Sequence, residues 1–133
     1  MIEIAVNGAC GRMGARIAAL VFEYPELKLV AALERSGNQS IGKDVGLVSG
    51  VGETGIKITM TMNAHADVLI DFSSPESAVA IAEYCARKNI ALVVGTTGLT
   101  AQQHEKIQHF SRQIACLVSP NMSVGVNALF DLV

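Results

Sequence analysis

The chain has 133 residues, which is enough for one domain with a hydrophobic core but not for two full domains. Half of the residues are hydrophobic, 17% are charged and the formal net charge is -2, so the sequence lacks the basic footprint of a protein that binds nucleic acid or an anionic membrane. No apolar stretch approaches the roughly 18 residues of a spanning helix, and the first residues lack a signal-peptide pattern, so we expect a cytoplasmic protein. Cys10, Cys85 and Cys116 form no CxxC pair, and the sequence predicts neither a disulfide nor a metal site.

The first part of the chain predicts a strand, a helix and a second strand. Residues 2–6 form a short apolar run rich in β-branched side chains, which is typical of a buried strand. Residues 13–22 repeat apolar side chains at helical spacing until Pro25 ends the pattern. Residues 27–33 form the second apolar run. The helix is therefore expected to pack on a sheet that contains both strands.

The middle of the chain has a weaker pattern. Residues 36–55 are rich in glycine and show no period, which predicts a long surface loop. Residues 57–62 alternate Ile58, Met60 and Met62 with polar side chains, which is the period of a half-buried strand. We expect that strand to lie at the edge of the sheet.

The remaining elements continue the alternation. The pattern predicts strands at 68–72, 91–94 and 114–118, a helix from Ser74 and Pro75 to about residue 88, and a helix from the Thr100 cap to about residue 112. Strands that alternate with helices of this length predict a doubly wound, mainly parallel sheet with helices on both faces.

A glycine-rich loop lies between the first strand and the first helix. Residues 8–14 read GACGRMG, a G-x-x-G-x-x-G pattern that allows a tight turn and lets backbone N–H groups and the positive helix end approach a pyrophosphate. Glu34 ends the second strand, where a carboxylate can accept hydrogen bonds from an adenosine ribose. The pattern predicts a Rossmann-type site for NADH or NADPH. A P-loop is excluded because no Lys followed by Ser or Thr comes after Gly14.

The sequence resembles the dihydrodipicolinate reductase family, whose members act in bacterial and plant lysine and diaminopimelate synthesis. The resemblance covers essentially the whole chain. It rests on VNGACGRMG at 6–14, ALER at 32–35, IDF at 70–72, GTTG at 95–98 and NMSVGVN at 121–127. These strings are individually modest, but their order and spacing are specific to the family.

The resemblance implies a set of cofactor-binding residues. Gly8, Ala9, Cys10, Gly11, Arg12 and Met13 would surround the pyrophosphate, and Glu34 and Arg35 would meet the adenosine ribose. Phe72, Gly95, Thr96 and Thr97 would lie along the cofactor, and Ser119, Pro120, Asn121 and Met122 would border the nicotinamide at a hinge. Several of these residues follow strand ends, where ligands of open parallel sheets bind.

Three positions keep more than one interpretation. Cys10 replaces a glycine frequent in the family, and it is either a tolerated small residue or a thiol beside the cofactor. Phe72 is either a cofactor contact or only a core residue, and the Gly95–Gly98 segment is either a cofactor contact or only a strand-to-helix turn. Met122 replaces a frequent phenylalanine, which is a mild departure.

The resemblance also implies a reaction. It is hydride transfer from NAD(P)H to 4-hydroxy-tetrahydrodipicolinate, a small-molecule substrate, with loss of water to give tetrahydrodipicolinate. The family's His-His-x-x-x-Lys and Ser-Gly-Thr segments are absent from this chain. We therefore expect cofactor binding without turnover and no catalytic residue here. The full-length protein is expected to be a homotetramer.

The predicted organisation is a dinucleotide-binding domain at 1–121 followed at 122–133 by a hinge and the start of a truncated substrate domain. Residues 124–133 place apolar side chains on one helical face without a stop signal, which suggests that they pack on another domain or subunit. His65, His104 and His109 are interpreted as surface residues. The alternative function is a non-catalytic NAD(H)-sensing module with the same fold.

Overall fold

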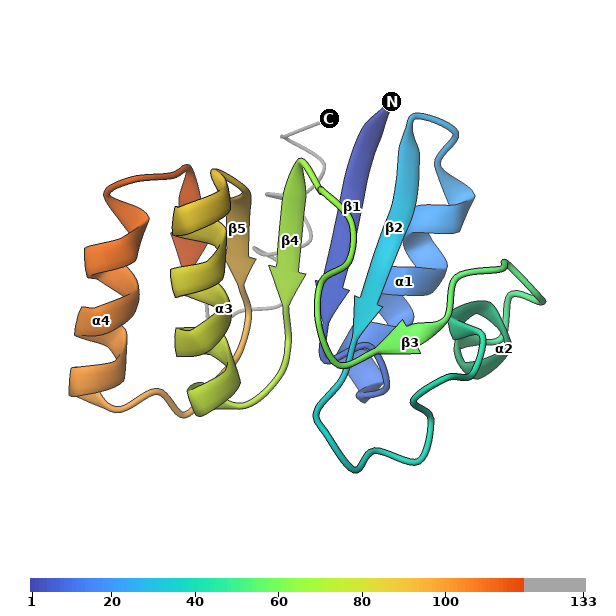
Figure 1. Cartoon of the computed structure of the whole chain (residues 1–133), viewed down its shortest axis with the longest axis horizontal. Helices are drawn as coiled ribbons and strands as arrows, with labels where there is room; N and C mark the ends of the chain where they lie inside the picture. Colours follow the sequence, from blue (N-terminus) through green and yellow to red (C-terminus); the bar gives the residue numbers. More distant parts are fainter. Residues whose placement is uncertain (119–133) are drawn as a thin grey trace.

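The computed structural model describes residues 1–118 and contains a single sheet with helices around it (Figure 1). The elements are β1 (Ile2–Asn7), α1 (Arg12–Glu23), β2 (Leu27–Leu33), α2 (Val45–Ser49), β3 (Ile58–Thr59), β4 (Val68–Asp71), α3 (Pro75–Lys88), β5 (Ala91–Val94), α4 (Ala101–Ser111) and β6 (Cys116–Val118). Within that range no helix is long and apolar enough to cross a membrane. The predicted domain boundary at 121 and the predicted helix at 124–133 fall outside the described residues.

The six described strands form one sheet in the order β3-β2-β1-β4-β5-β6. Every strand pair is parallel. β1 lies in the middle, and the direction of the chain across the sheet reverses between β1 and β4. This arrangement confirms the predicted doubly wound fold. The reversal also opens a crevice at the carboxyl ends of the strands, which is where such sheets bind ligands.

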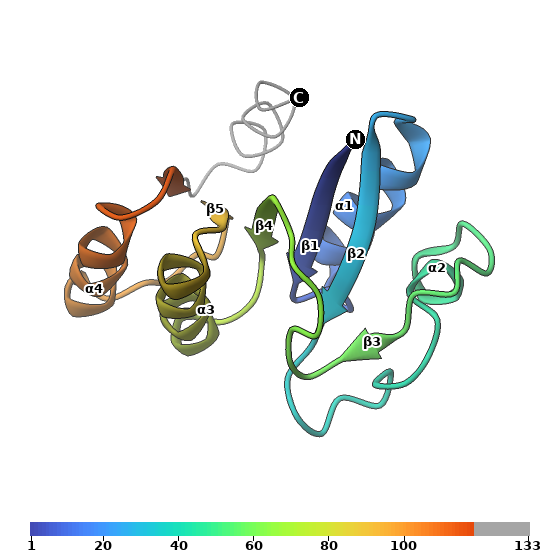
Figure 2. The same ribbon diagram turned by 45° about the horizontal axis from the view of Figure 1, so that its top comes forward.

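Two hydrophobic cores cover the two faces of the sheet. Successive side chains of β1 point to opposite faces, so that Ile4 and Val6 belong to the core under α1 while Ala5 belongs to the core under α3 and α4. Ile17 of α1 and Ile107 of α4 are almost wholly buried in these two cores. Figures 1 and 2 show α1 behind the sheet and α3 and α4 in front of it. Helices on both faces were predicted.

The predicted helix caps are present. The Ser74 side chain accepts a hydrogen bond from the Ser77 N–H, and Pro75 begins α3. Thr100 and Gln103 form a reciprocal capping box at the start of α4. A cap of this kind contributes about 1 kcal/mol by satisfying N–H groups that the helix cannot bond internally. These local signals explain why both helix starts could be predicted to within a residue.

The strand predicted at the edge of the sheet is confirmed as β3, but two other details of the middle of the chain were wrong. The loop predicted at 36–55 contains the short helix α2, whose five residues are too few to show a helical period. The strand predicted at 57–62 is only two residues long. The chain bends after Thr59, whose hydroxyl donates to the Thr61 carbonyl (3.0 Å), and Met60 is 55% exposed. The alternation of apolar and polar residues therefore continues past the end of the strand.

Candidate functional site

A cleft of about 300 Å³ lies at the carboxyl ends of the strands, at the point where the strand order reverses. Three segments form its walls: the loop after β1, the end of β2 with the residues that follow it, and the segment from the end of β4 to the first turn of α3. Residues of the first two walls are Asn7, Gly8, Cys10, Gly11, Glu34, Arg35 and Asn38, and residues of the third are Phe72, Ser73, Ser74 and Ser77. Six of the predicted site residues therefore meet in one place.

The three glycines of the segment from 8 to 14, which contains the loop after β1 and the first turn of α1, have different surroundings. A Cβ at Gly8 would lie 2.2 Å from the Phe72 carbonyl oxygen, and one at Gly14 would lie 1.9 Å from the Gly8 carbonyl oxygen. Gly8 also has a φ of 83°, which favours glycine. These two glycines let the loop pack against β4 and α1. A Cβ at Gly11 would meet nothing closer than 3.4 Å, and Gly11 borders the cleft, so its missing side chain leaves room for a ligand.

The amino end of α1 directly follows this loop. Gly11 is its N-cap and supplies no side-chain hydrogen bond, and the first turn contains no acidic residue. The N–H groups of a helix start carry a partial positive charge and lack intrahelical partners. The start of α1 is therefore suited to an anion such as a phosphate. Arg12, the first residue of the helix, is exposed.

The carboxylate of Glu34 connects the end of β2 with the glycine loop. Its Oε2 accepts a hydrogen bond from the Cys10 N–H and its Oε1 accepts one from the Arg35 N–H, both at 3.0 Å. Each carboxylate oxygen has two lone pairs, so these bonds leave acceptor capacity for a ligand. Glu34 is half-buried and Arg35 is exposed, and both border the cleft. Their contact with a cofactor stays a prediction.

The pKa of each of the three cysteine thiols is raised above its ordinary value. Burial, with a contribution from the Glu34 charge, raises the pKa of Cys10 although a hydrogen bond to Ser40 opposes it. Burial raises the pKa of Cys85 to about 12 and that of Cys116 to about 11. The thiolate is the reactive form of cysteine. Cys10 therefore fits the interpretation of a tolerated small residue beside the cleft better than that of a reactive thiol.

The ring of Phe72 packs directly against Gly95. The Phe72 ring occupies the space in which a Cβ of Gly95 would lie, at 2.2 Å from the ring Cε1. Phe72 packs against the core under α1 and also borders the cleft, so it is more than a core residue, and its contact with a cofactor stays a prediction. Gly95 is required by the ring of Phe72 rather than by the turn that follows. Thr97 is exposed outside the cleft lining.

Sequence reasoning missed a buried polar cluster beneath the cleft. Asp71, at the end of β4, is fully buried. Its Oδ1 accepts from the Asn7 Nδ2 (2.8 Å) and the Ser73 hydroxyl (2.5 Å), and its Oδ2 accepts from the Thr96 hydroxyl (2.6 Å). Burial raises the pKa of Asp71, and these hydrogen bonds oppose the rise. A polar residue at the end of each apolar run, Asn7 and Asp71, was the available signal.

The side chains of some predicted site residues do not line the cleft. Ala9 is fully buried in the core under α1, so that only its backbone could meet a ligand. Thr96 is buried, and its hydroxyl accepts from the Ser73 N–H (2.8 Å) and donates to Asp71. Met13 is half-buried at the start of α1. Ser119, Pro120, Asn121 and Met122 lie outside the described residues.

The fold is shared with solved oxidoreductases. A dipicolinate-bound dihydrodipicolinate reductase from Paenisporosarcina sp. TG-14 superposes with a TM-score of 0.69 at 23% identity, covering 93% of this chain and 49% of that one. A biliverdin reductase from Synechocystis sp. PCC 6803, solved with biliverdin and NADP+, gives a TM-score of 0.65 at 16% identity, covering 89% of this chain and 37% of that one. At these identities the likeness concerns the fold alone.

Sequence comparison is more specific. The family profile described as dihydrodipicolinate reductase, N-terminus, matches residues 2–122. The 4-hydroxy-tetrahydrodipicolinate reductases of Anaeromyxobacter dehalogenans (strain 2CP-1) and Methanopyrus kandleri are 43% and 42% identical to this chain, covering 100% and 99% of it and 50% of each relative. The chain thus spans about half the length of these relatives. The match over most of the chain, together with the cleft geometry, shows that the chain belongs to the dihydrodipicolinate reductase family.

Proposed function

We propose that this chain is the dinucleotide-binding part of a 4-hydroxy-tetrahydrodipicolinate reductase and that it binds NADH or NADPH in the cleft. One observation carries the proposal: the glycine loop, the uncapped start of α1 and the Glu34 carboxylate all face a single cleft where the strand order reverses. A cofactor that contains both a pyrophosphate and a ribose needs this combination. The space that a Cβ of Gly11 would fill is open to such a ligand.

The charges around the cleft suggest where the pyrophosphate and the adenosine ribose of the cofactor would lie. The pyrophosphate would lie at the start of α1, near Gly11 and Arg12, because anions are stabilised there. The adenosine ribose would lie against Glu34, whose carboxylate accepts hydrogen bonds from hydroxyl groups. Arg35 could grip a 2′-phosphate with charge-assisted hydrogen bonds, whereas Glu34 repels one. Because both side chains border the cleft, we propose tolerance of both cofactors.

For the whole protein we propose hydride transfer to 4-hydroxy-tetrahydrodipicolinate with loss of water, which gives tetrahydrodipicolinate. The dinucleotide supplies the hydride when it is bound, and this chain supplies binding and orientation. No histidine of residues 1–118 borders the cleft, and we propose that the proton donor lies elsewhere in the protein. The chain alone should therefore bind cofactor without turnover. The homotetramer implied by the family resemblance stays a prediction.

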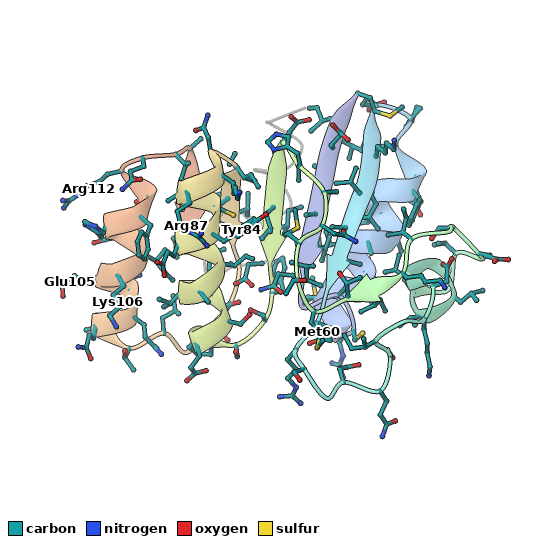
Figure 3. All side chains as sticks on the ribbon, viewed as in Figure 1. Met60, Tyr84, Arg87, Glu105, Lys106 and Arg112 are labelled. Atoms are coloured by element: carbon teal, nitrogen blue, oxygen red, sulfur yellow. The ribbon has the colours of Figure 1, made fainter. Side chains whose placement is uncertain are left out.

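Calorimetric titration with NADH and NADPH tests the proposal. We expect the two affinities to lie within roughly thirtyfold of each other, a gap of about 2 kcal/mol. Arg35→Ala should weaken mainly NADPH binding, and Glu34→Ala mainly NADH binding. Glu105→Ala and Arg112→Ala are matched charge controls because both residues lie on or after α4, far from the cleft (Figure 3).

Three outcomes would contradict parts of the proposal. A parent chain that binds neither cofactor would exclude the assigned site. If each variant lost affinity for NADH and for NADPH by the same factor, Glu34 and Arg35 would not determine the cofactor preference, but the assigned site would remain. Product formation from the dihydrodipicolinate precursor by the purified chain would contradict the proposal that this chain binds the cofactor while the proton donor lies elsewhere in the protein.

A further inference from the structure

A second hollow, of about 270 Å³, lies beside the cleft between the end of β2, the segment after β3 and the outer face of α3. Its walls are mainly apolar and include Leu33, Met60, Met62, Ile81 and Tyr84. Figure 3 labels Met60 and Tyr84, which come from opposite walls. The hollow and the cleft have two lining residues in common, Asn7 and Ser77. The two spaces therefore adjoin at a polar wall.

Asn7 is held in one orientation at this wall. Its Nδ2 donates to the Asp71 Oδ1 (2.8 Å) and to the Ser77 hydroxyl (3.0 Å). A carboxylate only accepts hydrogen bonds, so the amide nitrogen must face Asp71 and the amide oxygen must face away. The Asn7 side chain is 6% exposed, yet within residues 1–118 no group donates to its Oδ1. Because residues 1–118 enclose no side-chain polar atom that lacks a partner, this oxygen is accessible and can accept a hydrogen bond from a ligand or water.

Ser77 provides the complementary group. Its hydroxyl oxygen accepts from Asn7, so its hydrogen is directed to another acceptor. The described structure gives that hydrogen no acceptor. The wall thus presents an unused acceptor and an unused donor next to each other. A planar, largely apolar ligand with a donor beside an acceptor on one edge would satisfy both.

Adenine has such an edge. Its exocyclic amino group donates and its neighbouring ring nitrogen N7 accepts, the pair that asparagine side chains read in nucleic acids. The inference rests on the proposed function, in which Glu34 holds the adenosine ribose. The hollow shares Asn7 and Ser77 with the cleft that Glu34 lines, so the base attached to this ribose can extend from the cleft into the hollow. We infer that Asn7 and Ser77 recognise the amino edge of the adenine, and that Asp71 is a positioning residue that fixes the Asn7 amide.

The parent chain provides the first test, by titration with NADH and with its deaminated analogue, nicotinamide hypoxanthine dinucleotide in the reduced form. The analogue replaces the amino group by a carbonyl, which would place an acceptor against the Asn7 Oδ1. Leaving a buried acceptor unsatisfied corresponds to about a tenfold loss of affinity. We therefore expect NADH to bind about tenfold more tightly than the analogue.

Two variants separate the contacts. Asn7→Ala should bind NADH and the analogue equally, because it removes the acceptor that distinguishes them. Ser77→Ala should weaken both ligands by a similar factor, because N7 is common to adenine and hypoxanthine. Ser111→Ala, at the end of α4, is a matched hydroxyl control that should change neither affinity. Circular dichroism of each variant checks its fold, and the comparison in the parent chain needs no variant.

Asp71→Asn tests the positioning role. The variant keeps the shape of the side chain but can present either a donor or an acceptor to Asn7, so the amide is no longer held in one orientation. The ratio of NADH to analogue affinity should fall to within about threefold. A purely structural role would lower both affinities and leave their ratio unchanged, which would overturn the assignment of Asp71.

The outcomes also distinguish this inference from the proposed function. A parent chain that binds NADH and the analogue equally would overturn the adenine assignment and leave the cofactor site intact. A parent chain that binds neither would overturn both. An Asn7→Ala variant that keeps the tenfold preference would show that another group reads the amino edge, and the inference would be wrong.

Discussion

Two loops of this chain are rich in glycine, and the residue has a different role in each. In the segment from 8 to 14, which contains the loop after β1 and the first turn of α1, Gly8 and Gly14 are required because a Cβ would collide with backbone atoms. In the segment from 36 to 55, five glycines have positive φ, and a Cβ on any of them would meet nothing within 4 Å: Gly37, Gly42, Gly50, Gly52 and Gly55. The first segment uses Gly8 and Gly14 to bring backbones together, whereas five of the six glycines of the second segment turn the chain. Glycine content alone therefore does not indicate a binding loop.

The largest effect should come from Gly14. Gly14→Ala would place a Cβ 1.9 Å from the Gly8 carbonyl oxygen, which is backbone and cannot move aside easily. We expect a loss of roughly 3 kcal/mol or more in the free energy of unfolding, as for a strongly overpacked site. Urea denaturation followed by circular dichroism measures it. Gly11→Ala is the matched control, since its nearest atom is 3.4 Å away. Equal stability of the two variants would contradict the comparison.

The next largest effect concerns binding rather than folding. Gly11→Val would fill the space beside the start of α1 while its φ of -70° suits any residue. We expect NADH affinity to fall by more than about tenfold while the unfolding midpoint stays near that of the parent, because the backbone can no longer approach the pyrophosphate. If calorimetry shows parent-like NADH binding, the loop has been assigned the wrong role.

A smaller effect is expected in the second loop. Gly50 ends α2 with a φ of 87° and open space around it. Gly50→Ala should therefore cost about 1 kcal/mol of stability, from backbone strain alone, and should leave NADH affinity unchanged. Gly50→Asn should cost less because asparagine tolerates this conformation better. A loss as large as that of Gly14→Ala would remove the distinction between the loops.

The smallest effect concerns Asp44, which organises the second loop. Desolvation acts to raise the pKa of Asp44, but hydrogen bonds from Gly55, Thr54 and Gly46 outweigh it and lower the pKa from 3.8 to about 2. A lowered pKa in the folded state means that the ionised side chain stabilises the fold above about pH 4 and that this contribution is lost as the pH falls toward 2.

Asp44→Asn should therefore unfold at a slightly lower temperature than the parent at pH 7, and the two melting temperatures should converge between pH 4 and pH 2. Calorimetric scans across that range measure the difference. Glu53→Gln is a suitable control, because Glu53 is an exposed carboxylate in the same loop. A gap that stays constant down to pH 2 would show that charge is not the cause.

Gly46 sharpens the comparison between the loops. It lies in α2 within the segment from 36 to 55, and a Cβ there would lie 2.0 Å from the Gly52 carbonyl oxygen. Gly46 also donates its N–H to the Asp44 carboxylate at 2.7 Å. The 44–55 segment is thus a compact unit built around one carboxylate rather than an unstructured connection.

Long and strongly periodic elements of the fold could be predicted from the sequence. β1, α1 and β2 were expected nearly at their observed bounds because apolar runs, helical spacing and Pro25 mark them. Helix α2 was not predicted. Its capping residues, Asp44 and Gly50, flank only five helical residues, which are too few to show a helical period. The length of β3 was overestimated because the alternation continues past the pairing with β2, which involves only two residue pairs.

The candidate site was predicted in part. Glycine spacing and the position of Glu34 depend on local sequence, and the structure brings both to the cleft. The cluster around Asp71 depends on contacts between β1, β4 and β5, which join residues 25 to 64 positions apart. No local pattern records such contacts. A polar residue at the end of each apolar run was the only hint.

The parallel sheet has a consequence for how the chain folds. Its central pairing joins Ile4 to Val68 and Asn7 to Asp71, and no strand of the described sheet pairs with a neighbour through a tight hairpin. The contact order of such a topology is high, because long loops must close before the central strands gain their partners. On the ribosome, β1 and β2 can pair while the segment that contains β4 is still being synthesised. The open edge of β1 is then a site for aggregation until β4 arrives, so folding of this chain should depend on the rate of translation.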